Sequence, residues 1–381
     1  MNTKVRSDFY FPSIDLLRAL AVTMVVIYHI VEIGSWKQFP TSWPISYFRI
    51  GWLGVDLFFV ISGFVITLNV ISMLSSEHTK YVSTFIKNRV ARIVPLYILT
   101  SGVFLVLFSS IYFNRPAHAW SMDLFLHAIF LHNLFPSTAG TLNDVTWSLG
   151  LEVQFYAFAV MMIPFLLKIG AIGTLTILTL AAWLYRFLIT CILVPGVADT
   201  QLQVIFTSFQ LPGALDQFSM GMASAILFHQ KRELLLKIRT LPMLRLMLII
   251  SSAAVFMTSI FIIERNIPYW SNIWMIIFWR TLVSIAFLLL LLSATSADLP
   301  AILQPIAYIG KISYGIYLWH PIVLRLIISE TGIREVNLLL LTWIITLCLA
   351  AVSWHFFELP VMQWMRRRAT ISRRSGGISS I

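Results

Sequence analysis

The chain has 381 residues, of which 59% are hydrophobic and only 11% are charged. A water-soluble globular protein of this composition would lack the polar side chains that cover a folded surface. The composition therefore excludes a soluble protein and indicates an integral membrane protein.

Apolar stretches long enough to cross a bilayer as helices recur along the whole chain. A helix rises about 1.5 Å per residue, so a span needs about 20 apolar residues. Residues 120–135 have the length of a re-entrant or interfacial segment instead. The pattern predicts an all-α integral membrane protein with about ten transmembrane helices, at residues 14–33, 51–73, 93–112, 149–167, 171–190, 206–228, 243–263, 271–293, 305–328 and 336–357.

The net charge of +11 does not indicate a nucleic-acid partner, because the basic residues gather in alternate loops. With ten spans, these loops lie on the side of the N-terminus, as the positive-inside rule requires for two cytoplasmic ends. Contact of a basic tail with anionic membrane lipid is a second interpretation of part of this charge. We expect a cytoplasmic N-terminus at 1–12, one transmembrane domain at 13–360 and a basic cytoplasmic tail at 361–381.

The first apolar stretch, RALAVTMVVIYH, has a permanent charge at one end and a titratable ring at the other. Arg18 and His29 are separated by about three helical turns, so they face the same side, about 16 Å apart along the axis. Taken singly, Arg18 could snorkel to lipid headgroups and His29 could hydrogen-bond between helices. Their shared face favours a common cleft.

The second span contains GVDLFFVISGF, with Asp56 near its outer end. Small residues allow helices to approach closely, which is the interpretation we prefer for Ser62 and Gly63. Asp56 either caps the start of the helix or orients His29 from the neighbouring span.

Two arginines lead into the third span, in FIKNRVARIVPLY. Arg89 and Arg92 are three residues apart and so share one helical face at the cytoplasmic surface. The positive-inside bias alone would explain them. A pair on one face, opposite Arg18, would also bind phosphate, because guanidinium groups match phosphate oxygens with two hydrogen bonds.

Several polar residues are expected inside the membrane, where a charge costs about 2.5 to 3.5 kcal/mol on insertion scales. Glu152, in WSLGLEVQFY with Trp147, is expected at the depth of His29, although pairing with Arg186 or Arg280 is an alternative. His320, in ISYGIYLWHP, also falls in the outer half.

Asp216, in PGALDQF, either contacts an acceptor or pairs with a cation. The sequence thus predicts arginines near the cytoplasmic side and carboxylate and imidazole groups toward the other. Burial and neighbours adapt such groups to general acid–base catalysis. This arrangement suggests a phosphorylated donor that enters from the cytoplasm and an acceptor on the outer side.

These stretches together resemble the membrane acyltransferase-3 family, integral-membrane O-acyltransferases that modify bacterial polysaccharides, lipopolysaccharide O-antigen, nodulation factors and some antibiotics. The resemblance covers about residues 10–360 and follows six motifs in the order of the family. They are IDLLRAL with the Arg18 to His29 spacing, GVDLFFVISGF, the Arg89 and Arg92 pair with Pro95 and Tyr97, WSLGLEVQFY, ISYGIYLWHP and FELP.

The resemblance implies that Arg18, His29, Arg89 and Arg92 take part in activity, and Glu152 matches the glutamate of its motif. It also implies an acyl-CoA, most often acetyl-CoA, as co-substrate with no bound cofactor, and a location in the bacterial cytoplasmic (inner) membrane. The acceptor would be a cell-envelope glycan or lipid-linked glycan. Many relatives carry an additional esterase-like domain, so we expect this chain to act alone or with a separate periplasmic partner of that kind.

The chain departs from the family pattern at three positions. Leu16 stands where a glycine is usual, and Asn88 replaces a frequent arginine. Val153 replaces a second acidic residue, which weakens any mechanism that needs two adjacent carboxylates.

We expect the three arginines to hold the CoA phosphates and His29 to act as general base on an acceptor hydroxyl. Asp56 or Glu152 would orient the ring. Transient acylation of His29 is an alternative route. His320, Asp216 and Trp147 are candidates for acceptor contact or support.

A different class of function is a multi-pass transporter or lipid-linked sugar flippase, which would also carry intramembrane charges. Release of free CoA separates the two classes. We expect no metal site, because His127 and His132 are five residues apart, which does not place them on one helical face, and no cluster of Cys and His exists.

Overall fold

The fold is known from a computed structural model, which describes residues 11–37, 39, 45–76, 81–193, 206–266, 269, 272–295 and 299–365. Within these residues every regular element is a helix, which confirms the predicted all-α class. Most of the N-terminal and C-terminal segments, including the basic tail residues Arg366–Arg368, lies outside the described residues.

The first half of the chain forms α1 Pro12–Ile33, η1 Ile45–Ile50, α2 Leu53–Ser76, α3 Tyr81–Leu107, α4 Ser109–Phe113, α5 Ala117–Ala128, η2 His132–Leu134, α6 Thr146–Leu188 and η3 Ile189–Leu193. The second half forms α8 Leu211–Gln230, α9 Arg232–Thr240, α10 Pro242–Arg265, η5 Met275–Trp279, α11 Arg280–Thr295, η6 Ala301–Leu303, α12 Gln304–Lys311, α13 Ser313–Thr331, α14 Glu335–Ser353 and η7 Trp354–Glu358.

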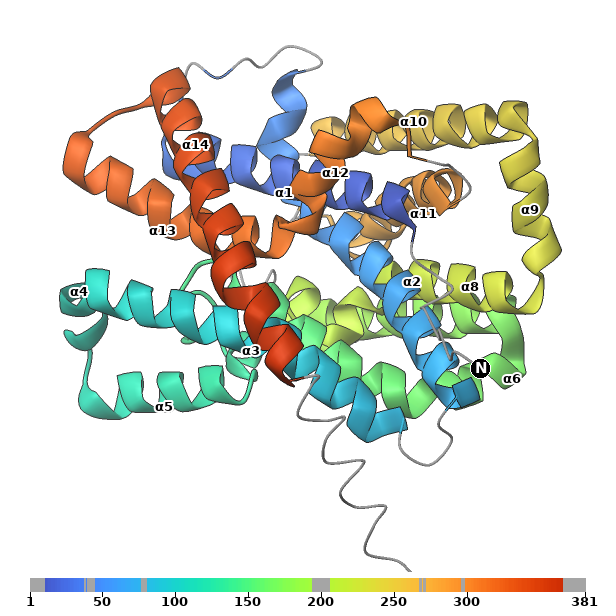
Figure 1. The fold of residues 1–381 in the computed structure, drawn as a ribbon, viewed down its shortest axis with the longest axis horizontal. Coiled ribbons are helices and arrows are strands. Elements are labelled where there is room, and N and C mark those ends of the chain that lie inside the picture. The colour runs from blue at the N-terminus through green and yellow to red at the C-terminus, as the bar shows by residue number, and fades with distance from the viewer. Residues whose placement is uncertain are drawn as a thin grey trace, which may run out of the picture.

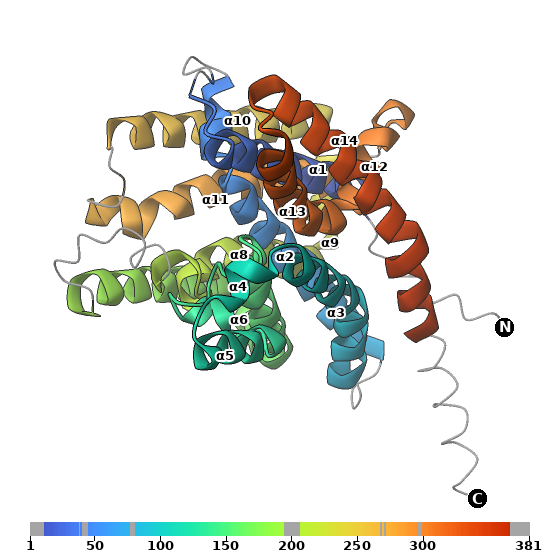
Figure 2. The ribbon, with the colours of Figure 1, turned by 90° about the vertical axis from the view of Figure 1, so that its left-hand side faces the viewer.

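Helices α1 and α2 lie in the middle of the molecule (Figure 1). Helix α2 packs against α1 and also against α6 and α8, while α1 packs against α12 and α13 (Figure 2). At one end of the molecule α9 crosses between α8 and α10, and α4 and α5 lie at the opposite end (Figure 1). Arg18 and His29 both belong to α1, one of these two central helices.

The predicted count of ten transmembrane helices is not confirmed. In the part of the chain that the structure describes, seven helices are long and apolar enough to cross a membrane, or eight if α12 and α13, bent by 59°, form one span. The expected spans 149–167 and 171–190 correspond to the two helical arms of α6, which are separated by a non-helical break at Gly170, where φ is +76°. The expected span 206–228 corresponds to α8, which carries Asp216, Gln217 and His229 and is less apolar.

Glycines set the close packing of α2 against its neighbours. A Cβ atom on Gly63 would overlap the carbonyl oxygen of Phe218 in α8, and one on Gly221 in α8 would overlap the carbonyl oxygen of Val60. The structure therefore confirms the packing interpretation of Gly63. Ser62 differs: its hydroxyl donates a hydrogen bond to Glu152 and lines a pocket.

Two buried ion pairs join the helices of the core. Arg280 of α11 donates two hydrogen bonds, of 2.9 and 3.0 Å, to the carboxylate of Asp56 in α2. Arg186 of α6 lies 2.7 Å from the carboxylate of Asp216 in α8, which also accepts a hydrogen bond from Thr281. Each of these four buried charges thus has an opposite charge beside it, which offsets its desolvation.

A polar cluster around Asp123 ties α4 and α5 to the loop before α6. The buried Asp123 carboxylate accepts hydrogen bonds from Tyr112, Arg115 and Thr141 and lies 3.0 Å from His127. Burial by itself would raise the pKa of this carboxyl, but hydrogen bonds from His127, Arg115 and Thr141 outweigh it and lower the pKa to about 2.

His127 and His132 lie together, although their five-residue spacing does not place them on one helical face. Their rings stack with centroids 4.0 Å apart. The reason is that α5 ends at Ala128 and the chain turns at Phe130, where φ is +58°, before η2 begins. Burial, with His127 close by, lowers the pKa of His132 to about 4.

Gly221→Ala tests the contact between α2 and α8. The added methyl group meets backbone atoms that cannot rotate away, and overpacking of this kind costs about 1 to 3 kcal/mol. We expect a lower thermal unfolding midpoint for this variant, measured in lipid nanodiscs. Gly102→Ala in α3 is the matched control, because a Cβ there would meet nothing within 4 Å. Equal midpoints for the two variants would contradict the proposed tight packing.

Candidate active site

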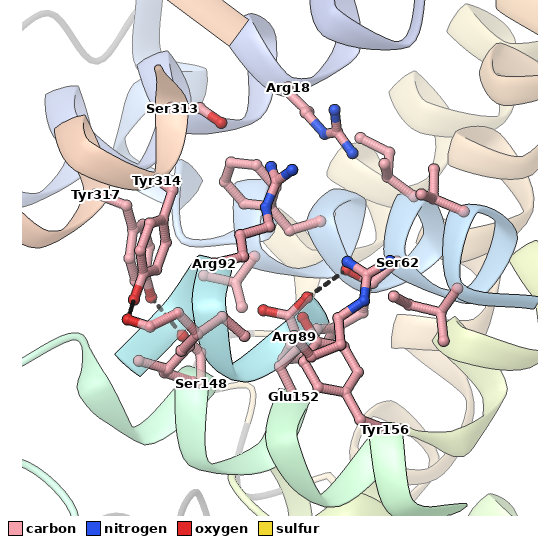
Figure 3. A pocket seen from close by; sticks show the side chains of 18 residues that line it. Arg18, Ser62, Arg89, Arg92, Ser148, Glu152, Tyr156, Ser313, Tyr314 and Tyr317 are labelled. Atoms are coloured by element: carbon pink, nitrogen blue, oxygen red, sulfur yellow. Dashed lines mark hydrogen bonds between the residues drawn. The ribbon is translucent and has the colours of Figure 1, made fainter. Parts of the chain in front are cut away.

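Three arginines face one pocket at the centre of the molecule, which we call the arginine pocket. Arg18 comes from α1, and Arg89 and Arg92 come from α3. Figure 3 shows their guanidinium groups around one space, with Glu152 of α6 below them. The remaining polar lining comes from α2, α6 and α13, namely Ser62, Ser148, Tyr156, Ser313, Tyr314 and Tyr317.

The arginine pocket carries an excess of positive charge. Its lining holds three guanidinium groups and one carboxylate. Arg18 is paired with Asp15 at 2.8 Å. Within the described residues neither Arg89 nor Arg92 forms an ion pair with a carboxylate. A pocket of this kind attracts an anion, and forked guanidinium donors match phosphate oxygens.

Among the described residues, Arg89 is held by aromatic rings rather than by a carboxylate. Its guanidinium carbon lies 5.3 Å from the ring centroid of Phe85 and 5.5 Å from that of Tyr156. Its Nε atom is buried and has no hydrogen-bond partner within the described structure. Cation–π contacts of this type fix the side chain and leave its donors to a ligand.

Glu152 lies with the arginines, which corrects the expectation that it shares the depth of His29. Its carboxylate accepts a hydrogen bond of 2.8 Å from Ser62. The physical reason is the length of α3, which begins at Tyr81 rather than at residue 93. Arg89 and Arg92 therefore lie within the helix, not before it, and reach the level of Glu152. Arg186 and Arg280, the alternative partners expected for Glu152, each form an ion pair with an aspartate instead.

His29 faces a second pocket, which we call the histidine chamber. Aromatic rings form much of its wall, and Trp147 stacks on Phe209 with ring centroids 3.8 Å apart. Asp144, which pairs with Arg325 through a hydrogen bond of 3.0 Å, supplies a carboxylate at the wall. The other lining residues include Tyr28, Trp52, Ser208, Tyr269, Arg280 and Tyr317.

The structure brings His320 to His29. Nε2 of His320, in α13, lies 3.1 Å from Nδ1 of His29, in α1. His320 is fully buried. The predicted placement of His320 near His29 is therefore observed, and it joins residues that are 291 positions apart in the sequence.

Asp56 and Asp216 lie in ion pairs rather than beside the imidazole of His29. Both oxygens of Asp56 accept hydrogen bonds from Arg280, which corrects the expected contact with His29. Asp56 does lie in the first turn of α2, at the start of the helix, which was the other expected placement. For Asp216 the alternative of pairing with a cation is observed, since its carboxylate lies 2.7 Å from Arg186. The geometry thus gives Asp56 no orienting role toward His29 and gives Asp216 the second of its two expected roles.

The two pockets adjoin at a neck formed by Val55 of α2 and Tyr317 of α13, which line both of them. The hydroxyl of Tyr317 is hydrogen-bonded to Ser148 at 2.7 Å and donates to the carbonyl of Val145. Sequence reasoning missed both neck residues. A signal existed for Tyr317, because it stands three residues before His320 and so shares its helical face.

Within the described residues no group of three or more His, Cys, Asp or Glu side chains could hold a metal ion. Among the described residues, the acidic side chain that contacts the stacked rings of His127 and His132 is Asp123, which lies 3.0 Å from His127.

Three known proteins are similar to the chain over most of its length. The O-acetyltransferase OatA of Staphylococcus aureus (strain NCTC 8325 / PS 47) is 28% identical over 380 residues, covering 94% of this chain and 58% of OatA. YrhL of Bacillus subtilis (strain 168), a proposed peptidoglycan O-acetyltransferase, is 27% identical over 385 residues, covering 95% of this chain and 56% of YrhL. ORF330 of Acidianus two-tailed virus, a proposed acetyltransferase, is 27% identical over 320 residues, covering 82% of each.

The chain spans somewhat more than half the length of OatA and YrhL. No solved structure matches it. The family model for the acyltransferase domain matches residues 11–357, which is nearly the whole chain and includes every residue of the two pockets. The chain therefore belongs to the acyltransferase-3 family and carries its membrane acyltransferase domain.

Proposed function

We propose that the protein transfers an acetyl group from cytoplasmic acetyl-CoA to a hydroxyl group of a cell-envelope glycan, across the bacterial cytoplasmic membrane. The observation that carries the proposal is the pair of adjoining pockets. One holds three guanidinium groups and the other holds an imidazole, and both share Val55 and Tyr317. A donor with a charged end and a reactive end some distance away fits this pair.

The proposed binding of the acetyl-CoA phosphates rests on the charge of the arginine pocket. Acetyl-CoA carries its phosphates at the nucleotide and its thioester at the far end of a thin pantetheine arm. Arg18, Arg89 and Arg92 offer donors that suit phosphate oxygens, and two of them have no carboxylate partner among the described residues. A bound phosphate would therefore replace repulsion among three like charges with attraction.

The neck between the two pockets is the proposed path of the thin pantetheine arm of the donor. Val55 is buried in α2, and Tyr317 is held by hydrogen bonds to Ser148 and Val145. In this proposal the thin pantetheine arm, not the bulkier nucleotide, passes beside these two side chains. The nucleotide would remain in the arginine pocket while the thioester enters the histidine chamber.

In the histidine chamber His29 would act as general base. Its ring takes the proton of an acceptor hydroxyl, and the oxygen attacks the thioester carbonyl carbon. The carbon–sulfur bond breaks, the ester forms, and the leaving thiolate receives the proton from His29. Because one group accepts and returns the same proton, no further acid is needed.

The proposed glycan acceptor rests on the wall of the chamber and on the relatives. Aromatic faces such as those of Trp52 and Trp147 suit the apolar faces of sugar rings, and Asp144 can accept hydrogen bonds from sugar hydroxyls. The similar proteins are named for O-acetyl transfer, and YrhL for peptidoglycan as acceptor. A separate esterase-like partner belongs to the same proposal, as a protein that would accept the acetyl group on the outer side.

CoA release by the purified protein in lipid nanodiscs tests the function. With acetyl-CoA and an extract of cell-envelope glycans present, we expect CoA release that needs both the extract and His29. His29→Ala should lower the rate by at least about a hundredfold, the lower range of what a general base contributes. His118→Ala, an exposed histidine outside both pockets, is the control. Full activity of His29→Ala would remove this assignment, and no release by the wild type would favour a transporter.

The donor site is tested by the arginines of α3. Arg89→Gln and Arg92→Gln should each raise the KM for acetyl-CoA about tenfold or more, because a hydrogen bond to a charged group is worth about 1.5 to 3 kcal/mol. Lys87→Gln is the control, since Lys87 is an exposed cation on the same helix. Similar KM values for all three variants would show that the arginine pocket does not hold the donor.

The neck is tested by Val55→Trp. A large ring at this position should block passage between the pockets, so acetyl transfer should fall at least tenfold while acetyl-CoA still binds. Binding is measured by calorimetry and transfer by CoA release. Val106→Trp, at a position exposed on α3, is the control. Undiminished transfer by Val55→Trp would mean that the donor arm takes another path.

A further inference from the structure

We infer that His320 is a positioning residue that holds the ring proton of His29 on Nδ1 and thereby leaves Nε2 of His29 as the base. The inference rests on the proposed function for its consequence. Its structural part is independent, because it concerns which nitrogen carries a proton. The following contacts carry it.

The first contact fixes the proton of His320. Its Nδ1 lies 3.1 Å from the carbonyl oxygen of Ile316, one helical turn earlier. A carbonyl oxygen only accepts hydrogen bonds, so Nδ1 of His320 must carry the hydrogen. Pro321 follows in the same helix and has no N–H group, which leaves the neighbouring carbonyl of Tyr317 without its usual helical donor. The surroundings of this nitrogen are therefore rich in acceptors.

The second contact determines which nitrogen of His29 carries the proton. In a neutral imidazole one nitrogen donates and the other accepts. Since Nδ1 of His320 donates, its Nε2 accepts, and the atom 3.1 Å away is Nδ1 of His29. Nδ1 of His29 must then be the donor. The carbonyl of Val25, one turn earlier in α1, is a further acceptor for the same ring.

The remaining nitrogen of His29 is Nε2, which carries a lone pair in this tautomer. His29 lines the histidine chamber, so this lone pair is available to an acceptor hydroxyl there. In the opposite tautomer Nε2 would carry a hydrogen and could not accept a proton. The ring of His320 thus does for His29 what a carboxylate does in a Ser-His-Asp triad, without placing a negative charge in the membrane.

His320 is too deeply buried to touch the acceptor itself. Its side chain is inaccessible to solvent, and it does not belong to the lining of either described pocket. Its ring centroid lies 5.1 Å from that of His29 and 5.9 Å from that of Tyr317. His320 would therefore act through His29, and it lies close to Tyr317 of the neck.

Nitrogen NMR of the histidine rings tests the inference directly. The protein is labelled with ¹⁵N at its eight histidines and studied in lipid, with His29→Ala used to assign the signals of His29. We expect a protonated Nδ1 and an unprotonated Nε2 on His29 in the wild type. A protonated Nε2 with an unprotonated Nδ1 would overturn the inference. The result does not depend on acetyl-CoA or on an acceptor, so it is independent of the proposed function.

Kinetics of two variants tests the consequence. His320→Leu removes the acceptor, whereas His320→Gln places an amide oxygen near the position of Nε2. We expect kcat to fall about ten- to a hundredfold in the Leu variant with an unchanged KM for acetyl-CoA, less than the roughly 10²- to 10⁴-fold that a general base itself contributes, because the base is still present. The Gln variant should recover at least part of this loss.

His355→Leu is the control, because this exposed histidine is hydrogen-bonded only to Tyr308 in the described contacts. Equal loss in the Leu and Gln variants, or a loss confined to KM, would contradict a positioning role. If His320→Leu does not fold, the NMR measurement on the wild type and the kinetics of the Gln variant decide. Failure of the wild type to release CoA would instead remove the proposed function and leave the tautomer assignment to NMR.

Discussion

The cost of a charge among apolar helices determines how this protein is built. An ionised side chain away from water needs an opposite charge, several hydrogen bonds or a polar cavity. In the described core Asp56 has Arg280, and Asp216 has Arg186. Arg89 and Arg92 depart from this rule, because the charge that would balance them is not supplied by a described carboxylate. The arginine pocket is therefore the place where an anionic ligand would supply the missing negative charge, as the proposed function requires.

One ion pair and two glycine contacts hold α2 in place. Gly63 and Gly221 bring α2 against α8, and Arg280 ties α2 to α11 through Asp56. Helix α2 then presents Ser62 to the arginine pocket and Val55 to the neck. A shift of α2 would change the arginine pocket and the neck together. Stability and geometry of the site therefore depend on one helix.

The sequence predicted the faces of single helices better than the contacts between them. The spacing of Arg18 and His29 was enough to place both on one side of α1, and the structure has them in adjoining pockets. Helical periodicity defines a face, but it does not give the rotation or the depth of the helix that faces it. For this reason Glu152 was expected with His29, although it hydrogen-bonds to Ser62 beside the arginines. The same limit hid the stacking of His127 on His132, which depends on a turn at Phe130.

The choice of a histidine behind His29 follows from the same constraint that governs the ion pairs. An aspartate in that position would orient the ring, but it would add a charge to a wall formed by α1 and α13, where each ionised group raises the cost of burial. A neutral imidazole supplies a directed acceptor without a charge, and the carbonyl of Ile316 fixes its direction. When His29 takes a proton, its Nδ1–H continues to donate to His320, so the positive charge that forms is stabilised by an existing hydrogen bond. A histidine at this position thus orients the ring of His29 through a hydrogen bond and, being uncharged, can remain buried.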